Sequence, residues 1–350
     1  MKYTILLICI LALACHKKNY TSDIEKYMKE QVDKNNFSGV VLVMKDDKVV
    51  VEKAYGLADR EWNIPNTVDT KFRIGSLTKQ FTATCILQLQ EQGKLAVTDK
   101  LSKYIPDYPK GDSITIQMLL NHTSGIKNYT DVPEFWNGIA LMRTTPDSMI
   151  SIFKNKPLDF SPGTDWKYSN SGYFLLGYII EKVTGGKYTA YVEKNVIKKV
   201  GMVNSGIDKL DSVLYHRASG YDNDSGKFFN SMFISMEGPF SAGAMYSTVD
   251  DLYKWDRALY STAILSNASK TQMFTPVKHN YGFGVGIDTF QHHYRISHSG
   301  GISGFVSELQ RYPIDNICVI VLSNDGGNSP AIANGISSIL FDAPLPQPNK

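Results

Sequence analysis

Gly75-Ser76-Leu77-Thr78-Lys79 marks the point where an extended segment of this sequence meets a helix. Residues 71–74 alternate in the manner of a short strand, and apolar residues recur at helical spacing after Lys79 until Gly93 supplies a stop signal. The pattern therefore places Ser76 in the first turn of a helix. Lys79 follows three residues later on the same helical face.

A serine at this point has the surroundings that a nucleophile requires. A hydroxyl attacks a carbonyl poorly until a base removes its proton, and a lysine in an apolar, desolvated cleft can act as that base. The unpaired N–H groups and the positive dipole end of the helix would stabilise the oxyanion that forms. Ser76 and Lys79 are therefore the candidate nucleophile and base.

Ser-x-x-Lys is a weak pattern, so its other copy has to be considered. The second copy, Ser151-Ile152-Phe153-Lys154, lies inside a stretch predicted to be helical from Pro146 onward. No glycine and no strand lead into it. We therefore expect Ser76 to be the reactive serine and Ser151 to be an ordinary helix residue.

The composition is that of an ordinary globular protein. The 350 residues suffice for one large domain or two lobes, and the formal net charge of +3 is too small to indicate nucleic acid or an anionic membrane surface as a partner. Cys85 and Cys318 occupy apolar positions, so we expect buried free thiols. No cysteine–histidine cluster has the spacing of a zinc site.

The N-terminus predicts export from the cytoplasm. Lys2 precedes an apolar run over residues 5–14 that is too short for a permanent membrane anchor and ends in the small residues that signal peptidase requires. Leu-Ala-Leu-Ala before Cys15 resembles a bacterial lipobox. We favour lipidation of Cys15 over release of the protein, and either outcome places it in the cell envelope or outside. Residues 1–14 are then a signal peptide and residues 15–21 a tether.

Strand patterns occur at both ends of the remaining chain and helical patterns in its middle. A capping box at Ser22 opens an amphipathic helix to about residue 35, and residues 94–281 are mainly helical. The predicted strands are residues 39–44, 49–55, 294–297, 305–312 and 317–324, with a closing helix at 332–341 and a frayed tail at 344–350. We predict one two-lobed α/β (α+β) domain over residues 22–343. It combines an antiparallel sheet built from both chain ends, flanking helices and an inserted helical lobe.

Tyr168-Ser169-Asn170 supplies further groups that acyl transfer needs. It lies in a polar loop directly before an apolar helix predicted over residues 173–183. We expect Lys79 to lower the pKa of the Tyr168 phenol, and the Asn170 amide to bind both Lys79 and a substrate carbonyl. A second Tyr-x-Asn, at residues 221–223, is predicted to be a solvated turn.

His298-Ser299-Gly300-Gly301 lies near the start of the C-terminal strands. Glycines there let a substrate approach the backbone closely. The N–H of Gly301 can then serve as a second oxyanion donor beside that of Ser76, although a glycine-rich hairpin without chemistry would have the same sequence. His122, which closes a short helix before Gly125, is interpreted as structural rather than functional.

Together, the three clusters resemble the signatures of a known family. Ser76-Leu77-Thr78-Lys79, Tyr168-Ser169-Asn170 and His298-Ser299-Gly300 match, in order, the S-x-x-K, Y-x-N and K/H-x-G motifs of penicillin-recognising serine hydrolases. The closest branch looks like the class C β-lactamases and their D-alanyl-D-alanine carboxypeptidase, esterase and D-aminopeptidase relatives. Residues 119–125 and 241–248 also look like this branch, and the resemblance extends over residues 37–324.

The resemblance implies a β-lactamase/transpeptidase-like fold and an acyl-enzyme mechanism without a metal or organic cofactor. Ser76 would attack a carbonyl of a small-molecule or peptide substrate while the Lys79–Tyr168 pair takes its proton. How that pair divides the role of base stays open, as does the oligomeric state. Asn170, His298, Ser299, Gly300 and Gly301 would line the substrate and oxyanion side, and Tyr168 would protonate the leaving group.

One position departs from the β-lactamase pattern. His298 stands where those enzymes usually carry a lysine, and a histidine near its reference pKa is mostly neutral at about pH 7. This favours peptidase or esterase substrates over β-lactams. It also predicts that activity on carboxylate-bearing substrates falls between about pH 5.5 and about pH 8, as His298 loses its proton.

Two other classes of protein make different demands on the sequence. An α/β-hydrolase would need Gly-x-Ser-x-Gly and a histidine late in the chain, but the sequence lacks that pentapeptide and no histidine follows His298. A catalytically silent sensor of peptidoglycan fragments or β-lactams would use the same fold. Three intact motifs argue against it.

Overall fold

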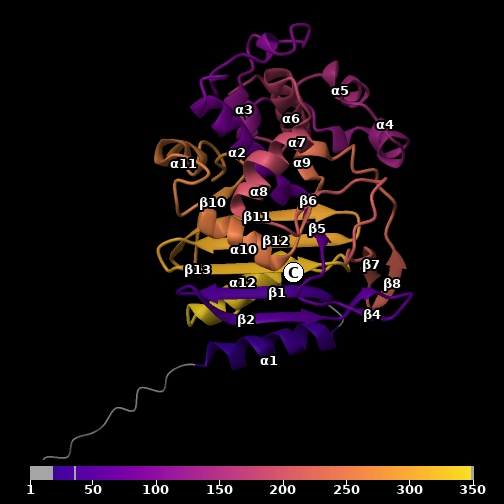
Figure 1. The fold of residues 1–350 in the computed structure, drawn as a ribbon, viewed down its shortest axis with the longest axis vertical. Helices are drawn as coiled ribbons and strands as arrows, with labels where there is room; N and C mark the ends of the chain where they lie inside the picture. Colours follow the sequence, from indigo (N-terminus) through magenta and orange to yellow (C-terminus); the bar gives the residue numbers. More distant parts are fainter. Residues whose placement is uncertain (1–18, 35–36, 348–350) are drawn as a thin grey trace, which may run out of the picture.

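The centre of the protein is a six-stranded antiparallel sheet, seen in a computed structural model that describes residues 19–34 and 37–347. Its strand order is β10-β11-β12-β13-β1-β2 (Figure 1). The strands are β1 (Gly39–Lys45), β2 (Lys48–Tyr55), β10 (Gly286–Phe290), β11 (His293–Ile302), β12 (Phe305–Tyr312) and β13 (Ile317–Ser323). β1 pairs with β13 from Gly39 opposite Ser323 to Lys45 opposite Ile317, which confirms a sheet built from both chain ends.

The two faces of this sheet are buried under different helices. Val41 and Val43 of β1 face a core shared with α1 (Tyr20–Asp33) and α12 (Ser329–Leu340). The alternate residues of β1 face the larger core beneath α2 (Thr78–Glu91), α10 (Val249–Ala258) and the helical lobe. Burial on both faces explains why β1 and β13 read as continuous apolar runs.

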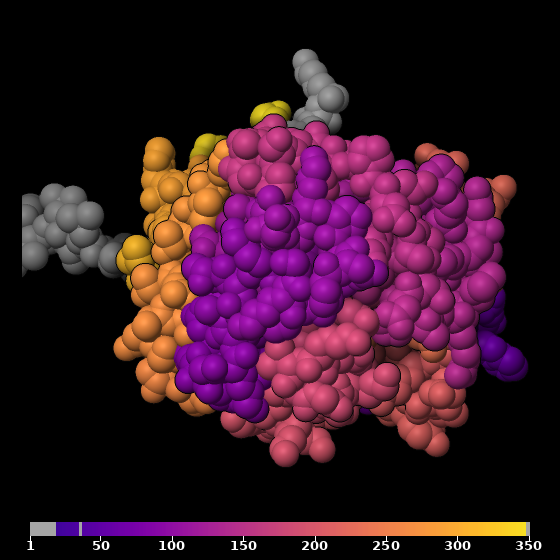
Figure 2. Space-filling model, turned by 90° about the horizontal axis from the view of Figure 1, so that it is seen from above, coloured from indigo at the N-terminus to yellow at the C-terminus, as the bar shows by residue number. Residues whose placement is uncertain are grey.

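The middle of the chain forms the helical lobe beside the β10–β11 edge of the sheet (Figure 1). Its helices are α3 (Ile116–Leu120), α4 (Pro133–Trp136), α5 (Pro146–Lys154), α6 (Asn170–Thr184), α7 (Tyr188–Val192), α8 (Lys198–Val200), α9 (Phe240–Gly243) and α11 (Asn267–Met273). Seen from above, the purple, magenta and pink segments of the lobe lie side by side, with the orange C-terminal half along one flank (Figure 2). The inserted helical lobe is therefore confirmed.

Short strands also lie outside the central sheet, and those within residues 94–281 interrupt the predicted helical middle. β5 (Phe72–Arg73), β9 (Met245–Ser247) and β6 (Gly206–Ile207) form one small sheet, while β3 (Leu57–Asp59) pairs with β4 (Ile64–Pro65) and β7 (Tyr221–Asp224) with β8 (Lys227–Asn230). The prediction of a solvated turn at residues 221–223 is wrong, because Tyr221 is buried and its hydroxyl oxygen accepts the N–H of Arg60. The pairings of β9 with β5 and β6 join segments distant in sequence, so no local pattern predicts them.

The start of the first helix also differs from its prediction. Asn19, rather than Ser22, caps α1, and its side-chain oxygen accepts the N–H of Ser22. Both residues belong to the types that favour this position, so the sequence alone did not distinguish them. The predicted signal peptide, the predicted lipidation site at Cys15 and the end of the predicted tail, residues 348–350, lie outside the described residues. Within residues 19–34 and 37–347, no helix is long and apolar enough to cross a membrane.

Candidate active site

The Ser76 segment has the predicted strand-to-helix geometry. β5 ends at Arg73, Ser76 lies in a 3-10 turn over Gly75–Leu77, and α2 continues from Thr78. Gly75 has φ of +49°, and a Cβ added there would lie 2.9 Å from the amide nitrogen of Gly301. The requirement for glycine at position 75 thus comes from the close approach of the Ser76 turn to β11.

Lys79 is the point at which three segments of chain converge. Its side chain is fully buried, and Nζ lies 2.9 Å from Oγ of Ser76. The same Nζ donates to Oδ1 of Asn170 at 2.7 Å and to the carbonyl of Ala242 at 2.8 Å, from α6 and α9. Burial holds the pKa of the Lys79 amine well below its usual range, because the charged form loses its hydration.

Tyr168 lies beside this cluster, in the loop before α6. Nζ of Lys79 is 4.8 Å from the centre of the Tyr168 ring. The side chain is partly exposed, but its phenolic oxygen is buried and has no hydrogen bond of good geometry among the described residues. Burial raises the pKa of this phenol, and the nearby Ser76 hydroxyl opposes the rise. The expectation that Lys79 lowers the pKa of Tyr168 is therefore wrong.

Two hydrogen bonds hold the His298 imidazole in one tautomer. Its Nδ1 lies 2.5 Å from the carbonyl of Ser299, which can only accept, and its Nε2 lies 2.8 Å from the hydroxyl of Tyr281. Nδ1 therefore donates and Nε2 accepts. Burial, helped by Lys79, lowers the pKa of His298 to about 4. The expected loss of the His298 proton between about pH 5.5 and about pH 8 is wrong, because the ring is already neutral throughout that range.

Residues 299–301 have different surroundings despite being consecutive. β10 pairs with β11 only as far as Ser297. After Ser297, the edge of β11 that β10 leaves unpaired lies against the Ser76 turn. A Cβ on Gly300 would lie 2.0 Å from the carbonyl oxygen of Ile74, whereas Gly301 borders open space. The Ser299 side chain points to the opposite face, next to Glu308, so only its main chain can contribute to a site around Ser76.

The second Ser-x-x-Lys pair has none of these features. Oγ of Ser151 is exposed on α5 and donates to the carbonyl of Ser148 at 2.7 Å. Lys154 instead forms an ion pair with Asp107 at 2.5 Å. The interpretation of Ser151 as an ordinary helix residue is confirmed.

Two residues of this region were not singled out from the sequence. Tyr281 precedes β10 and reaches His298, and Ala242 presents its main-chain carbonyl to Lys79. Their positions are set by tertiary packing, and no local pattern identifies them. Ala242 did lie in the stretch 241–248 that looked like the family, and this was the only available signal.

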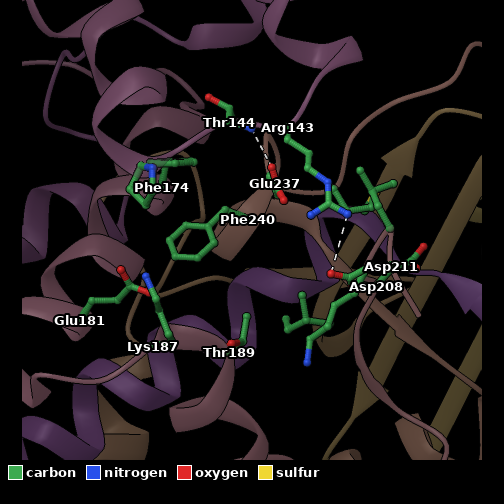
Figure 3. A pocket seen from close by; sticks show the side chains of 15 residues that line it. Arg143, Thr144, Phe174, Glu181, Lys187, Thr189, Asp208, Asp211, Glu237 and Phe240 are labelled. Carbon is green, nitrogen blue, oxygen red and sulfur yellow. Dashed lines mark hydrogen bonds and ion pairs between the residues drawn. The ribbon is translucent and has the colours of Figure 1, made fainter. Parts of the chain in front are cut away.

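A separate pocket of about 460 Å³ lies between α6, α7 and the segments at 207–211 and 236–240 (Figure 3). Phe174 and Phe240 are among the residues that line it, and Arg143 and Asp211 lie on the other side of the view. No residue of the three motif clusters lines it, so it is distinct from the site around Ser76.

Among the described residues, no group of histidine, cysteine and carboxylate side chains could hold a metal ion.

Comparison with known proteins places this geometry in context. The chain matches the family model described as "Beta-lactamase" over residues 24–338. PbpX of Bacillus subtilis (strain 168) is 34% identical over 273 residues, which are 77% of this chain and 66%, just under two thirds, of that protein.

Two solved structures extend the likeness to nearly the whole chain. The penicillin-binding protein from Bacillus halodurans has 30% identity and a TM-score of 0.80, covering 93% of this chain and 99% of the other. The D-stereospecific amidohydrolase from Streptomyces sp. has 25% identity and a TM-score of 0.81 with the same coverage.

Proposed function

Because this chain belongs to the beta-lactamase family of serine hydrolases, we propose that it hydrolyses an amide or ester through an acyl-enzyme on Ser76. The preferred substrate would be a D-amino-acid amide, a D-amino peptide or an ester without a carboxylate beside His298. The neutral, buried imidazole of His298 carries this proposal, because it offers no permanent cation to such a carboxylate. The name of the D-stereospecific amidohydrolase from Streptomyces sp. is consistent with it.

The hydrogen bonds of Lys79 suggest how the reaction begins. A neutral amine has two N–H donors and one lone pair, and the oxygens of Asn170 and Ala242 can only accept. With both donors used there, the lone pair is left for the Ser76 hydroxyl at 2.9 Å. Lys79 would therefore take the Ser76 proton as Oγ attacks the carbonyl carbon.

The remaining steps use the groups on either side of Ser76. The amide N–H groups of Ser76 and Gly301 would stabilise the oxyanion, since the Ser76 turn lies against Gly301. The Tyr168 phenol keeps its proton at neutral pH because burial raises its pKa. It would deliver that proton to the leaving group and recover one from the Lys79 ammonium, which returns Lys79 to the neutral amine. Water would then attack the acyl-enzyme, release the acid and regenerate the Ser76 hydroxyl.

A substrate panel measured at two pH values tests this proposal. We expect a D-amino-acid amide and a short-chain p-nitrophenyl ester to be hydrolysed with higher kcat/KM than a D-Ala-D-Ala peptide or nitrocefin. The ratio of wild-type to His298→Gln activity should change by less than about threefold between about pH 5.5 and about pH 8, because His298 does not titrate there.

The ratio of the two activities separates the effect of His298 titration from that of a second titrating group, Glu308. Burial raises the pKa of Glu308 to about 7, but Glu308 is present in both proteins. A preference for carboxylate-bearing substrates, or a ratio that follows a titration in this range, would contradict the proposed substrate class. Labelling of Ser76 by a fluorescent penicillin without any turnover would instead indicate a sensor.

We also propose that the protein is exported and tethered to the cell envelope through Cys15. This rests on the sequence of residues 1–15 alone. In a bacterial host, the mature protein should begin at Cys15, with a mass increase from the attached lipid, and should fractionate with membranes. Cys15→Ser should abolish both properties, and an unmodified N-terminus at any other residue would exclude the lipid anchor.

A further inference from the structure

His122 makes hydrogen bonds to the main chain on both sides of Tyr168. Its carbonyl oxygen accepts the N–H of Lys167 at 3.1 Å, and its Nδ1 accepts the N–H of Ser169 at 3.2 Å. His122 itself has φ of 64°, a left-handed conformation that few side chains adopt but in which histidine is enriched. The backbone of the Tyr168 segment is thus fixed from one residue at two points.

The His122 ring also contacts the side chains that complete the site. Its centroid lies 4.3 Å from that of Tyr168 and 4.7 Å from that of Tyr281. Tyr281 in turn forms the 2.8 Å hydrogen bond with Nε2 of His298. His122 therefore lies between Tyr168 and the residue that orients His298, and it connects two of the three motif clusters.

The role of Nδ1 as an acceptor requires a neutral imidazole. An N–H from Ser169 can be accepted only by an unprotonated ring nitrogen, so the single proton of neutral His122 resides on Nε2. Burial, together with Lys79 and His298, holds the pKa of His122 well below its usual range. His122 is thus suited to holding Tyr168 and not to exchanging protons with the substrate.

From these contacts we infer that His122 is a positioning residue that holds the Tyr168 phenol in line with Ser76 for the reaction proposed above. This revises the sequence-based view of His122 as a purely structural residue. Its effect on the rate should pass through Tyr168, because His122 accepts the N–H groups on both sides of Tyr168 and its ring packs at a tilt against the Tyr168 ring. A displacement of about 1 Å in such a group can lower a rate about 100-fold.

Two substitutions separate the contacts of His122. His122→Phe keeps an aromatic ring of similar size but removes the acceptor for the Ser169 N–H. His122→Asn keeps a side-chain acceptor and tolerates the left-handed backbone, but removes the ring contact. We expect His122→Phe to lower kcat by about 10- to 100-fold with KM within about threefold of wild type, and His122→Asn to lose less.

A double-mutant cycle with Tyr168→Phe distinguishes positioning from general stability. In the Tyr168→Phe background, the His122 substitution should lower kcat by less than about threefold, because the group it positions is already gone. Equal losses in both backgrounds, or wild-type kcat in folded His122→Phe, would overturn the inference. If His122→Phe does not fold, the same cycle with His122→Asn decides the question.

The outcome is separable from that of the proposed function. Wild-type kcat in Tyr168→Phe would refute the role of His122 while leaving the Ser76 acyl-enzyme intact. Full activity in Ser76→Ala would instead refute the proposed function itself.

Discussion

Ser76→Ala should lower kcat/KM for any hydrolysed substrate by about 10⁴-fold or more, as removal of a catalytic serine does in other serine hydrolases. The hydroxyl is half-buried at the start of α2, so its loss leaves no large cavity and the fold should persist. Steady-state hydrolysis of the preferred ester and near-ultraviolet circular dichroism would check both expectations.

Ser151→Ala is the matched control for this substitution. Ser151 has the same Ser-x-x-Lys spacing, but its hydroxyl donates to Ser148 on the surface of α5. Its removal should leave kcat/KM within about twofold of wild type, as is usual for surface substitutions. A loss at position 151 comparable to that at position 76 would mean that the wrong serine had been chosen.

Lys79→Met should have the second largest effect, a loss of about 10³- to 10⁴-fold in kcat/KM. Methionine fills much of the same volume but supplies no lone pair for the Ser76 proton. Because a buried amine with a lowered pKa gains little by being charged, the apolar replacement should leave the protein folded. Thermal unfolding measured beside the rate would confirm that the loss is chemical.

The pH dependence of kcat/KM tests whether the neutral amine of Lys79 is the base. The free amine is the base, so wild-type activity should fall as pH decreases through the lowered pKa of Lys79 and the amine becomes protonated. The residual activity of Lys79→Met should lack this acidic limb. Lys154→Met, which loses only the ion pair with Asp107, should retain the wild-type profile. Activity within about tenfold of wild type in Lys79→Met would transfer the role of base to Tyr168.

The sequence predicted the parts of the site that depend on local structure. The alternation before Gly75 and the apolar periodicity after Lys79 located Ser76 at a strand-to-helix turn, and Gly93, with φ of 66°, ends α2 as expected. The paired strands at the two chain ends were also recognisable, because their runs are long and apolar. In each case the signal was contained within about ten residues.

The electrostatics of the site could not be predicted in the same way. The neutral state of His298 and the raised pKa of Tyr168 both come from burial beneath segments distant in sequence, including the loop that carries Tyr281. The hydrogen bonds that connect His122 to Lys167 and Ser169 likewise span more than forty residues. Such contacts exist only after the lobe and the sheet have packed together, so no local pattern records them.

Mass spectrometry of protein quenched during turnover is the most direct test of a Ser76 acyl-enzyme. The protein would be mixed with the preferred ester, quenched in acid within milliseconds and digested. We expect one additional acyl group, located on the peptide that contains Ser76, and none in Ser76→Ala. An acyl group on another residue, or undiminished hydrolysis by Ser76→Ala, would contradict the mechanism.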